Sequence, residues 1–327
     1  MTEMKIVAMI IKRFLVTLLL LFFLVGCVAS DEQPGIPSGQ SPNVHQPGQG
    51  SGSTSPDANS PGAQEEHDDG DMWRIIVIDT SGEELWSFTE GTLSRLSQEQ
   101  AGAFSHVYST INNWPTARFY VADGYSVLGI LTAAGVHDVA QTVTFRSADG
   151  YEISLIREQL FSPQYFFPHV GESGDGAVQV LPIIAYRWRD GSDDMSEIRE
   201  DKPTLIFGQR NPFEHTNPAF VVGVTEIVVD AAPSERWVSA GTFPMAGEIP
   251  VGETVKLQHP SFGLVKLHYT LDGSDPTPLS PMYNPSTFRP ELNVPIPITG
   301  PTTIKVLVTG YGKVDSEIAV FEFRLAG

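Results

Sequence analysis

The sequence has almost no cysteine. Cys27 is the single cysteine among 327 residues, so beyond it this sequence has no disulfide framework, thiolate metal site or nucleophilic cysteine. Without disulfides the chain depends on a hydrophobic core. The roughly 260 residues expected to fold are long enough to bury one or two such cores.

Basic residues are also scarce. Twenty Lys and Arg face 39 Asp and Glu, which gives a formal net charge of −19. This excess of negative charge disfavours nucleic acid and anionic lipid surfaces as partners. We therefore expect no nucleic-acid partner.

The familiar catalytic motifs are missing too. The sequence holds no glycine-rich phosphate loop, no Gly-x-Ser-x-Gly elbow and no His-x-x-x-His pair, so phosphate, esterase and helical zinc chemistry lack support. Glu214 beside His215 is weak evidence for acid–base work, because adjacent residues on a loop seldom form a catalytic pair. We predict no catalytic residue and no metal ligand, and we favour a protein that is not an enzyme. The eight histidines are His45, His67, His106, His137, His169, His215, His259 and His268.

The first residues have the layout of an export signal. Lys12 and Arg13 precede an apolar run of about a dozen residues, shorter than the roughly 20 that a membrane-spanning helix needs. The run closes with Leu-Val-Gly-Cys at 24–27, which resembles the lipobox of bacterial lipoproteins. The resemblance implies cleavage between Gly26 and Cys27, and attachment of diacylglycerol and palmitate-type acyl chains at Cys27. We thus expect residues 1–26 to be a signal peptide and the mature chain to be lipid-anchored on the extracytoplasmic side of a cell membrane.

The next segment, residues 27–71, is rich in Gly, Pro, Ser and acidic residues. Such a composition buries too little apolar surface to offset its ordering entropy, so we predict a disordered linker after the lipidated cysteine. It ends in an acidic run at 65–71, which we interpret as a solvated charge run rather than a metal site. Loss of Glu3, Lys5, Lys12 and Arg13 with the signal leaves 38 acidic and 17 basic residues, a net charge of −21.

Residues 72–232 mix helix-like and strand-like patterns. Alternating apolar residues predict strands at 73–78 and 141–146, and Asp149-Gly150 predicts a hairpin turn after the second. Further strands are expected at 180–188, 203–208 and 219–229, and helices at 93–105 and 126–135, the latter capped by Ser126 and ended by Gly135. The pattern indicates an α+β domain with a substantial antiparallel component.

Part of this region resembles the molybdopterin-binding fold of the sulfite oxidase family. The likeness covers residues 125–230 and lies in the segments Ala-Ala-Gly-Val, Val-Thr-Phe-Arg-Ser-Ala-Asp-Gly-Tyr-Glu-Ile and Val-Thr-Glu-Ile-Val-Val. It implies a molybdopterin cofactor whose metal is held by a cysteine that precedes this region. Residues 93–124 contain no cysteine, so we expect a partial, degenerate fold without the cofactor. A molybdopterin-dependent oxidoreductase remains the alternative function.

Three other segments resemble recurring motifs of a group of multidomain surface proteins of Firmicutes. They are Tyr-Ser-Thr-Ile-Asn-Asn-Trp-Pro-Thr at 108–116, Tyr-Phe-Phe-Pro at 165–168, and Gly-Gln-Arg-Asn-Pro-Phe-Glu-His-Thr-Asn at 208–217. This resemblance implies a surface protein and no particular chemistry.

Residues 233–327 resemble the C-terminal β-sandwich domain of chitobiase and β-hexosaminidases. The likeness lies in Tyr-Thr-Leu-Asp-Gly-Ser-Asp-Pro-Thr at 269–277 and Ser-Pro-Met-Tyr-Asn at 280–284. It implies an immunoglobulin-like spacer module and brings no glycosidase residues. Asp272 and Asp275 suit tight turns better than a calcium site, and the acidic turn at 190–194 is likewise interpreted as a hairpin.

Two loops carry a candidate binding site. If they meet, aromatic rings would lie beside a cation and amide donors, which is the composition of a cleft for a sugar, a peptide or a pterin-like ring. The alternative is that the aromatic rings are core and the polar groups cap loops. The candidate ligand-binding residues are Trp114, Tyr165, Phe166, Arg210, His215 and Asn217.

These observations favour a lipid-anchored surface protein that binds a ligand or another envelope component without catalysis. Its expected partners are the membrane, through the lipid, and a cell-wall or carbohydrate component. Direct carbohydrate binding by the sandwich is a further alternative.

Overall fold

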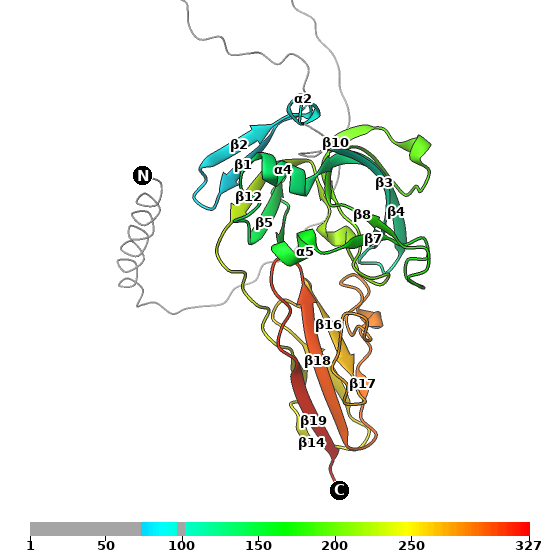
Figure 1. The fold of residues 1–327 in the computed structure, drawn as a ribbon. Coiled ribbons are helices and arrows are strands. Elements are labelled where there is room, and N and C mark those ends of the chain that lie inside the picture. Colours follow the sequence, from blue (N-terminus) through cyan, green and yellow to red (C-terminus); the bar gives the residue numbers. More distant parts are fainter. Residues whose placement is uncertain (1–72, 97–101) are drawn as a thin grey trace, which may run out of the picture. The chain divides into compact units, whose positions relative to one another are not determined.

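The computed structural model describes residues 73–96 and 102–327, and the regular secondary structure of these residues is mostly β-strand (Figure 1). The predicted signal peptide, Cys27 and the 27–71 linker lie outside the described residues. No helix within the described ranges has both the length and the apolar character needed to span a bilayer. The described chain is considered below as an N-terminal region, residues 73–232, and a sandwich region, residues 233–327.

The N-terminal region contains two five-stranded sheets. One has the strand order β2-β1-β12-β5-β6 and is antiparallel except where β1 and β12 run parallel. The other has the order β11-β10-β9-β4-β3 and is antiparallel throughout. The strands are β1 Ile75–Asp79, β2 Glu84–Phe88, β3 Ala103–Ile111, β4 Ala117–Ser126, β5 Thr142–Ser147, β6 Glu152–Ile156, β7 Gln164–Phe166, β8 Val178–Val180, β9 Ile183–Asp190, β10 Glu200–Ile206, β11 Val221–Val222 and β12 Val224–Asp230.

The single strand predicted at 219–229 is two strands in the structure. Gly223, between β11 and β12, has φ +73°, a conformation that favours glycine. The chain therefore turns at this residue and passes from one five-stranded sheet to the other. The apolar pattern is continuous across the turn because both strands contribute to one core.

The α-helices are short, five to seven residues each within the described ranges: α2 Glu90–Ser94, α4 Val127–Ala133 and α5 Arg157–Phe161. The helix predicted at 126–135 is confirmed as α4. The Ser126 hydroxyl accepts from the Gly129 amide, and Gly135 follows with φ +70°. The α+β mixture expected here is thus dominated by β-structure.

The helix predicted at 93–105 is wrong. The helix α2 ends at Ser94, and β3 begins at Ala103. The β-branched and aromatic residues Val107, Tyr108 and Ile111 favour a strand, and β3 pairs with β4 along its whole length. This long-range pairing outweighs the local helical spacing of apolar residues around Leu93.

The sandwich region has a three-stranded sheet in the order β13-β15-β17 and a four-stranded sheet in the order β14-β19-β18-β16. Their inward side chains form a second core, separate from that of the N-terminal region. Strict alternation along β18, with Ile304, Val306 and Val308 fully buried, is what a two-layer sandwich requires. The strands are β13 Gly241–Phe243, β14 Gly247–Ile249, β15 Thr254–Gln258, β16 Val265–Thr270, β17 Ile296–Pro297, β18 Thr302–Gly310 and β19 Ala319–Leu325.

The carboxylates of Asp272 and Asp190, at the two acidic turns, have partners within the protein. Asp272 Oδ1 accepts from the Ser274 amide at 3.0 Å and from its hydroxyl at 2.6 Å, and Gly273 has φ +85°. At the other turn, Asp190 pairs with Arg118 at 2.5 Å. Both are turns, as predicted.

Candidate functional site

The segment Gly-Gln-Arg-Asn-Pro-Phe-Glu-His-Thr-Asn, residues 208–217, is held firmly in place. The Gln209 side chain is fully buried. It accepts from the Ser109 hydroxyl at 2.6 Å and donates to the Glu214 carbonyl at 2.7 Å. At Gly208 an added Cβ would come within 2.5 Å of a Val180 methyl and 2.9 Å of the Tyr165 backbone. Only glycine fits there, so close packing explains the glycine at the start of this motif.

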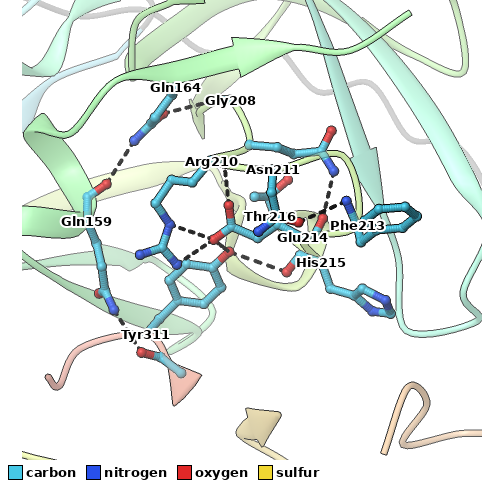
Figure 2. A network of polar contacts seen from close by, with 12 residues as sticks. Gln159, Gln164, Gly208, Arg210, Asn211, Phe213, Glu214, His215, Thr216 and Tyr311 are labelled. Carbon is cyan, nitrogen blue, oxygen red and sulfur yellow. Dashed lines mark hydrogen bonds and ion pairs between the residues drawn. The ribbon is translucent and has the colours of Figure 1, made fainter. Parts of the chain in front are cut away.

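Arg210 and Glu214 form a clamp at the start of this segment (Figure 2). Glu214 Oε1 accepts from Arg210 Nε at 2.9 Å and Nη2 at 2.5 Å, while its other oxygen accepts from the Arg210 amide at 2.6 Å. Burial alone lowers the pKa of Arg210, but the Glu214 carboxylate outweighs it and raises that pKa. Both carboxylate oxygens of Glu214 accept hydrogen bonds from Arg210, so Glu214 is poorly placed for proton transfer.

The loop between β18 and β19 reaches this clamp from the sandwich region. The Tyr311 hydroxyl lies 3.3 Å from Glu214 Oε1 and 3.4 Å from the His215 carbonyl oxygen. Figure 2 also shows Gln159 beside this loop. Its amide donates to the Gly310 carbonyl at 2.8 Å, and its oxygen accepts from the Gly312 amide at 3.0 Å. Burial and the Glu214 charge raise the pKa of Tyr311, so its hydroxyl stays protonated.

A cavity of about 440 Å³ lies beside the clamp, with walls from both regions of the chain. Apolar surface dominates its lining, and a few polar groups converge on it, as in ligand pockets generally. The rings of Tyr151, Phe213 and Trp237 line it, together with the amide side chains of Asn113 and Asn211.

His215, Lys266 and His268 lie near one another in the lining of this cavity and form its basic wall. His215 is only 9% exposed, and its Nδ1 is buried without a hydrogen-bond partner in the described structure. Figure 2 shows its imidazole directed away from the Arg210–Glu214 clamp. Burial, with smaller contributions from Lys266 and His268, lowers the pKa of His215 to about 3. Burial also lowers the pKa of Lys266 to about 8.

The structure brings together only two of the six predicted site residues, Arg210 and His215, which line the cavity. The others lie elsewhere. Tyr165 and Phe166 pack against apolar clusters, as in the alternative interpretation, and the Asn217 amide donates to the Tyr120 hydroxyl at 2.8 Å.

Trp114 stays at the surface. It is 57% exposed and stacks in parallel on Phe288, which is 62% exposed, with ring centroids 6.2 Å apart. It is adjacent in sequence to Asn113, which lines the cavity. The two aromatic rings therefore offer a flat apolar surface, and Trp114 belongs to the same loop as the cavity residue Asn113.

Lys266 and His268 were missed by the sequence analysis. The sequence does contain a pattern that could have indicated them. In Val-Lys-Leu-His-Tyr-Thr, Lys266 and His268 alternate with the buried Val265 and Leu267, and this alternation places both on the opposite face of β16. The sequence could not show that this face meets residues 210–215. The described residues contain no group of three or more His, Cys, Asp or Glu side chains arranged to hold a metal ion.

Comparison with known proteins gives one family match. Residues 244–320 match the chitobiase/beta-hexosaminidase C-terminal domain. A search of curated proteins gave no match to the chain. The family match agrees with the two-sheet structure of the sandwich region and with the resemblance stated from its sequence.

Proposed function

We propose that this protein is a non-catalytic, carbohydrate-binding protein of the cell envelope, with its ligand in the cavity beside the Arg210–Glu214 clamp. The matched C-terminal domain, named for chitobiase and β-hexosaminidase, supports the ligand class. The observation that carries the proposal is the cavity itself, whose aromatic residues come from both regions of the chain and are joined by Asn113 and Asn211.

The cavity lining suits a sugar ring. The apolar C–H faces of a sugar pack against aromatic rings, while its hydroxyls need donors and acceptors placed around the edge. Phe213 is 41% exposed and lines the cavity beside Asn211. The exposed Trp114–Phe288 pair offers a second stacking surface for a longer saccharide.

Isothermal titration calorimetry with the lipidated chain in detergent tests this function, with cell-wall oligosaccharides and neutral and acidic plant oligosaccharides as ligands. Phe213→Ala should weaken binding about tenfold, the loss expected for one stacking ring. Phe243→Ala is the matched control, because Phe243 is 61% exposed and does not line the cavity. Equal affinities for both variants and the parent, or no binding of any oligosaccharide, would contradict the proposal.

The membrane location is part of the same proposal and depends on Cys27. Its support is the sequence: a basic head, a short apolar run and a cysteine after Gly26. Metabolic labelling with an alkyne palmitate analogue tests it. The parent chain should incorporate the label and sediment with membranes, and Cys27→Ala should do neither. Label retained by Cys27→Ala would contradict anchoring at this residue.

For residues 72–232 we propose a molybdopterin-domain-like fold that works without its cofactor. The donor set does not fit a molybdenum centre of the sulfite oxidase type, because no cysteine lies between residues 28 and 327. Metal analysis of the purified chain tests this. Stoichiometric molybdenum or tungsten would support the alternative oxidoreductase function instead.

A further inference from the structure

The basic wall of the cavity combines side chains that are distant in sequence. Lys266 and His268 lie two residues apart on β16, whereas His215 belongs to the 208–217 segment. All three line the same cavity. Because residues i and i+2 of a strand share one face, Lys266 and His268 point to the same side of their sheet.

Lys266 has no carboxylate partner among the described residues. Its ammonium lies 3.3 Å from the carbonyl oxygens of Asn284 and Pro285. An ammonium has three N–H donors, so two weak contacts leave one donor free. The other Lys and Arg residues of the cavity are paired: Arg210 with Glu214 at 2.5 Å and Lys313 with Glu235 at 2.6 Å.

The acidic residues of the cavity do not neutralise Lys266. Glu152 pairs with Arg146 at 2.7 Å, and Glu214 is held by Arg210. Burial raises the pKa of Asp315, and the nearby charge that favours ionised Asp315 most is that of Arg210. An uncompensated cation therefore remains in a chain whose overall charge is strongly negative, which marks it as a candidate functional group.

The histidines add directional groups to this cation. His268 Nδ1 lies 3.1 Å from the Ser280 carbonyl oxygen; a carbonyl only accepts, so this nitrogen carries the proton. His215 Nδ1 has no partner although it is buried. His215 therefore has hydrogen-bonding capacity that the described part of the protein does not use. Trp237 lines the same cavity, but its indole N–H is buried and unpartnered and does not face the cavity.

We propose that Lys266, with His215, binds an oxyanion carried by the saccharide ligand: a carboxylate, sulfate or phosphate substituent. This inference rests on the proposed carbohydrate function and narrows it to acidic saccharides. The oxyanion accepts from the free Lys266 donor. His215 supplies a second donor from a ring nitrogen in the matching tautomer.

The first arm of the test uses inorganic sulfate and phosphate alone. The acetylation rate of Lys266 in the full lipidated chain is followed by mass spectrometry, with ionic strength matched by sodium chloride. At ten times the Kd, either anion should slow acetylation of Lys266 about tenfold. The exposed Lys256 should be unaffected. Unchanged Lys266 acetylation with both anions would overturn the oxyanion site.

The second arm compares tetragalacturonate with neutral galactotetraose by calorimetry. The acidic ligand should bind at least about tenfold tighter, Lys266→Met should remove that advantage, and Lys266→Arg should keep most of it. Equal affinities for the two ligands would overturn the inference. Protection of Lys266 by sulfate without any saccharide binding would overturn the carbohydrate function and leave the oxyanion site standing.

Discussion

His215 illustrates how burial fixes the protonation of a single residue. Its folded pKa of about 3 lies below the ordinary value of 6.5, so between these values the unfolded chain binds a proton that the folded chain excludes. Stability contributed by the neutral ring is therefore complete above about pH 6.5 and is lost as the pH falls toward 3.

We predict that His215→Gln makes the protein less sensitive to acid. Between pH 7 and pH 4 the parent should lose about 3 kcal/mol of unfolding free energy more than the variant, because glutamine takes up no proton. Urea unfolding at the two pH values measures this difference. His169→Gln is the control, since His169 is exposed; the same pH dependence in parent and His215→Gln would refute the prediction.

Asn284 shows why the Ser-Pro-Met-Tyr-Asn motif ends in an amide. It is 1% exposed; its Oδ1 accepts from the Leu267 amide at 2.8 Å, and its Nδ2 donates to the carbonyls of Val265 and Phe262 at 2.7 and 3.1 Å. One side chain thereby satisfies three backbone groups at the edge of β16. The motif is a structural signature rather than a catalytic one.

Asn284→Ala should lower the unfolding free energy by on the order of 3 kcal/mol, because it leaves those buried backbone groups unpaired. Asn284→Asp, which keeps the acceptor and loses the donors, should also destabilise the fold. Chemical denaturation of the full chain gives both values. A loss below about 1 kcal/mol for Asn284→Ala would mean that water replaces the amide.

At the scale of elements, the β18–β19 loop is the feature that joins the sandwich to the rest of the site. Gly312 sits in it with φ +81°, and an added Cβ would lie 3.0 Å from the Ser154 Cβ and 3.1 Å from the Ser154 carbonyl oxygen. Both the backbone conformation and the space around it require glycine.

Gly312→Ala should therefore destabilise the protein by more than the roughly 1–2 kcal/mol that a positive φ costs a residue with a Cβ. Gly273→Ala is a matched control, with φ +85° and nothing within 4 Å of the added atom. Comparing the two unfolding free energies isolates the contact with Ser154. Equal losses would show that the loop moves away without cost.

For the molecule as a whole, Gln159 couples the two regions. It bonds to the backbone of Gly310 and Gly312 across the junction, while the Tyr311 ring packs edge-on against Phe207 with centroids 5.8 Å apart. The cavity needs this junction, because its walls come from both sides.

Gln159→Ala should loosen the junction and separate the unfolding of the two regions. We expect one calorimetric transition in the parent and two in the variant, with a loss of about 1–3 kcal/mol for each unpaired backbone group. The exposed Gln258→Ala is the control. A single transition in Gln159→Ala at the parent temperature would contradict the coupling.

The sequence by itself determined the sandwich and its turns. Asp272-Gly273 specifies a tight turn and alternating β18 residues specify a two-layer core, because both depend on local geometry and a period of two. It also predicted α4 through Ser126 and Gly135, which act within one or two helical turns. It failed at 93–105, where pairing with β4, not local spacing, decides the conformation.

The tertiary structure alone decided the candidate site. Tyr165, Phe166 and Asn217 are residue types typical of a binding cleft. In the structure Tyr165 and Phe166 pack against apolar clusters, and Asn217 donates to the Tyr120 hydroxyl. Lys266 becomes a candidate ligand-binding residue only because β16 and residues 210–215 line the same cavity. This arrangement depends on contacts between segments dozens of residues apart, and local sequence patterns do not predict such contacts.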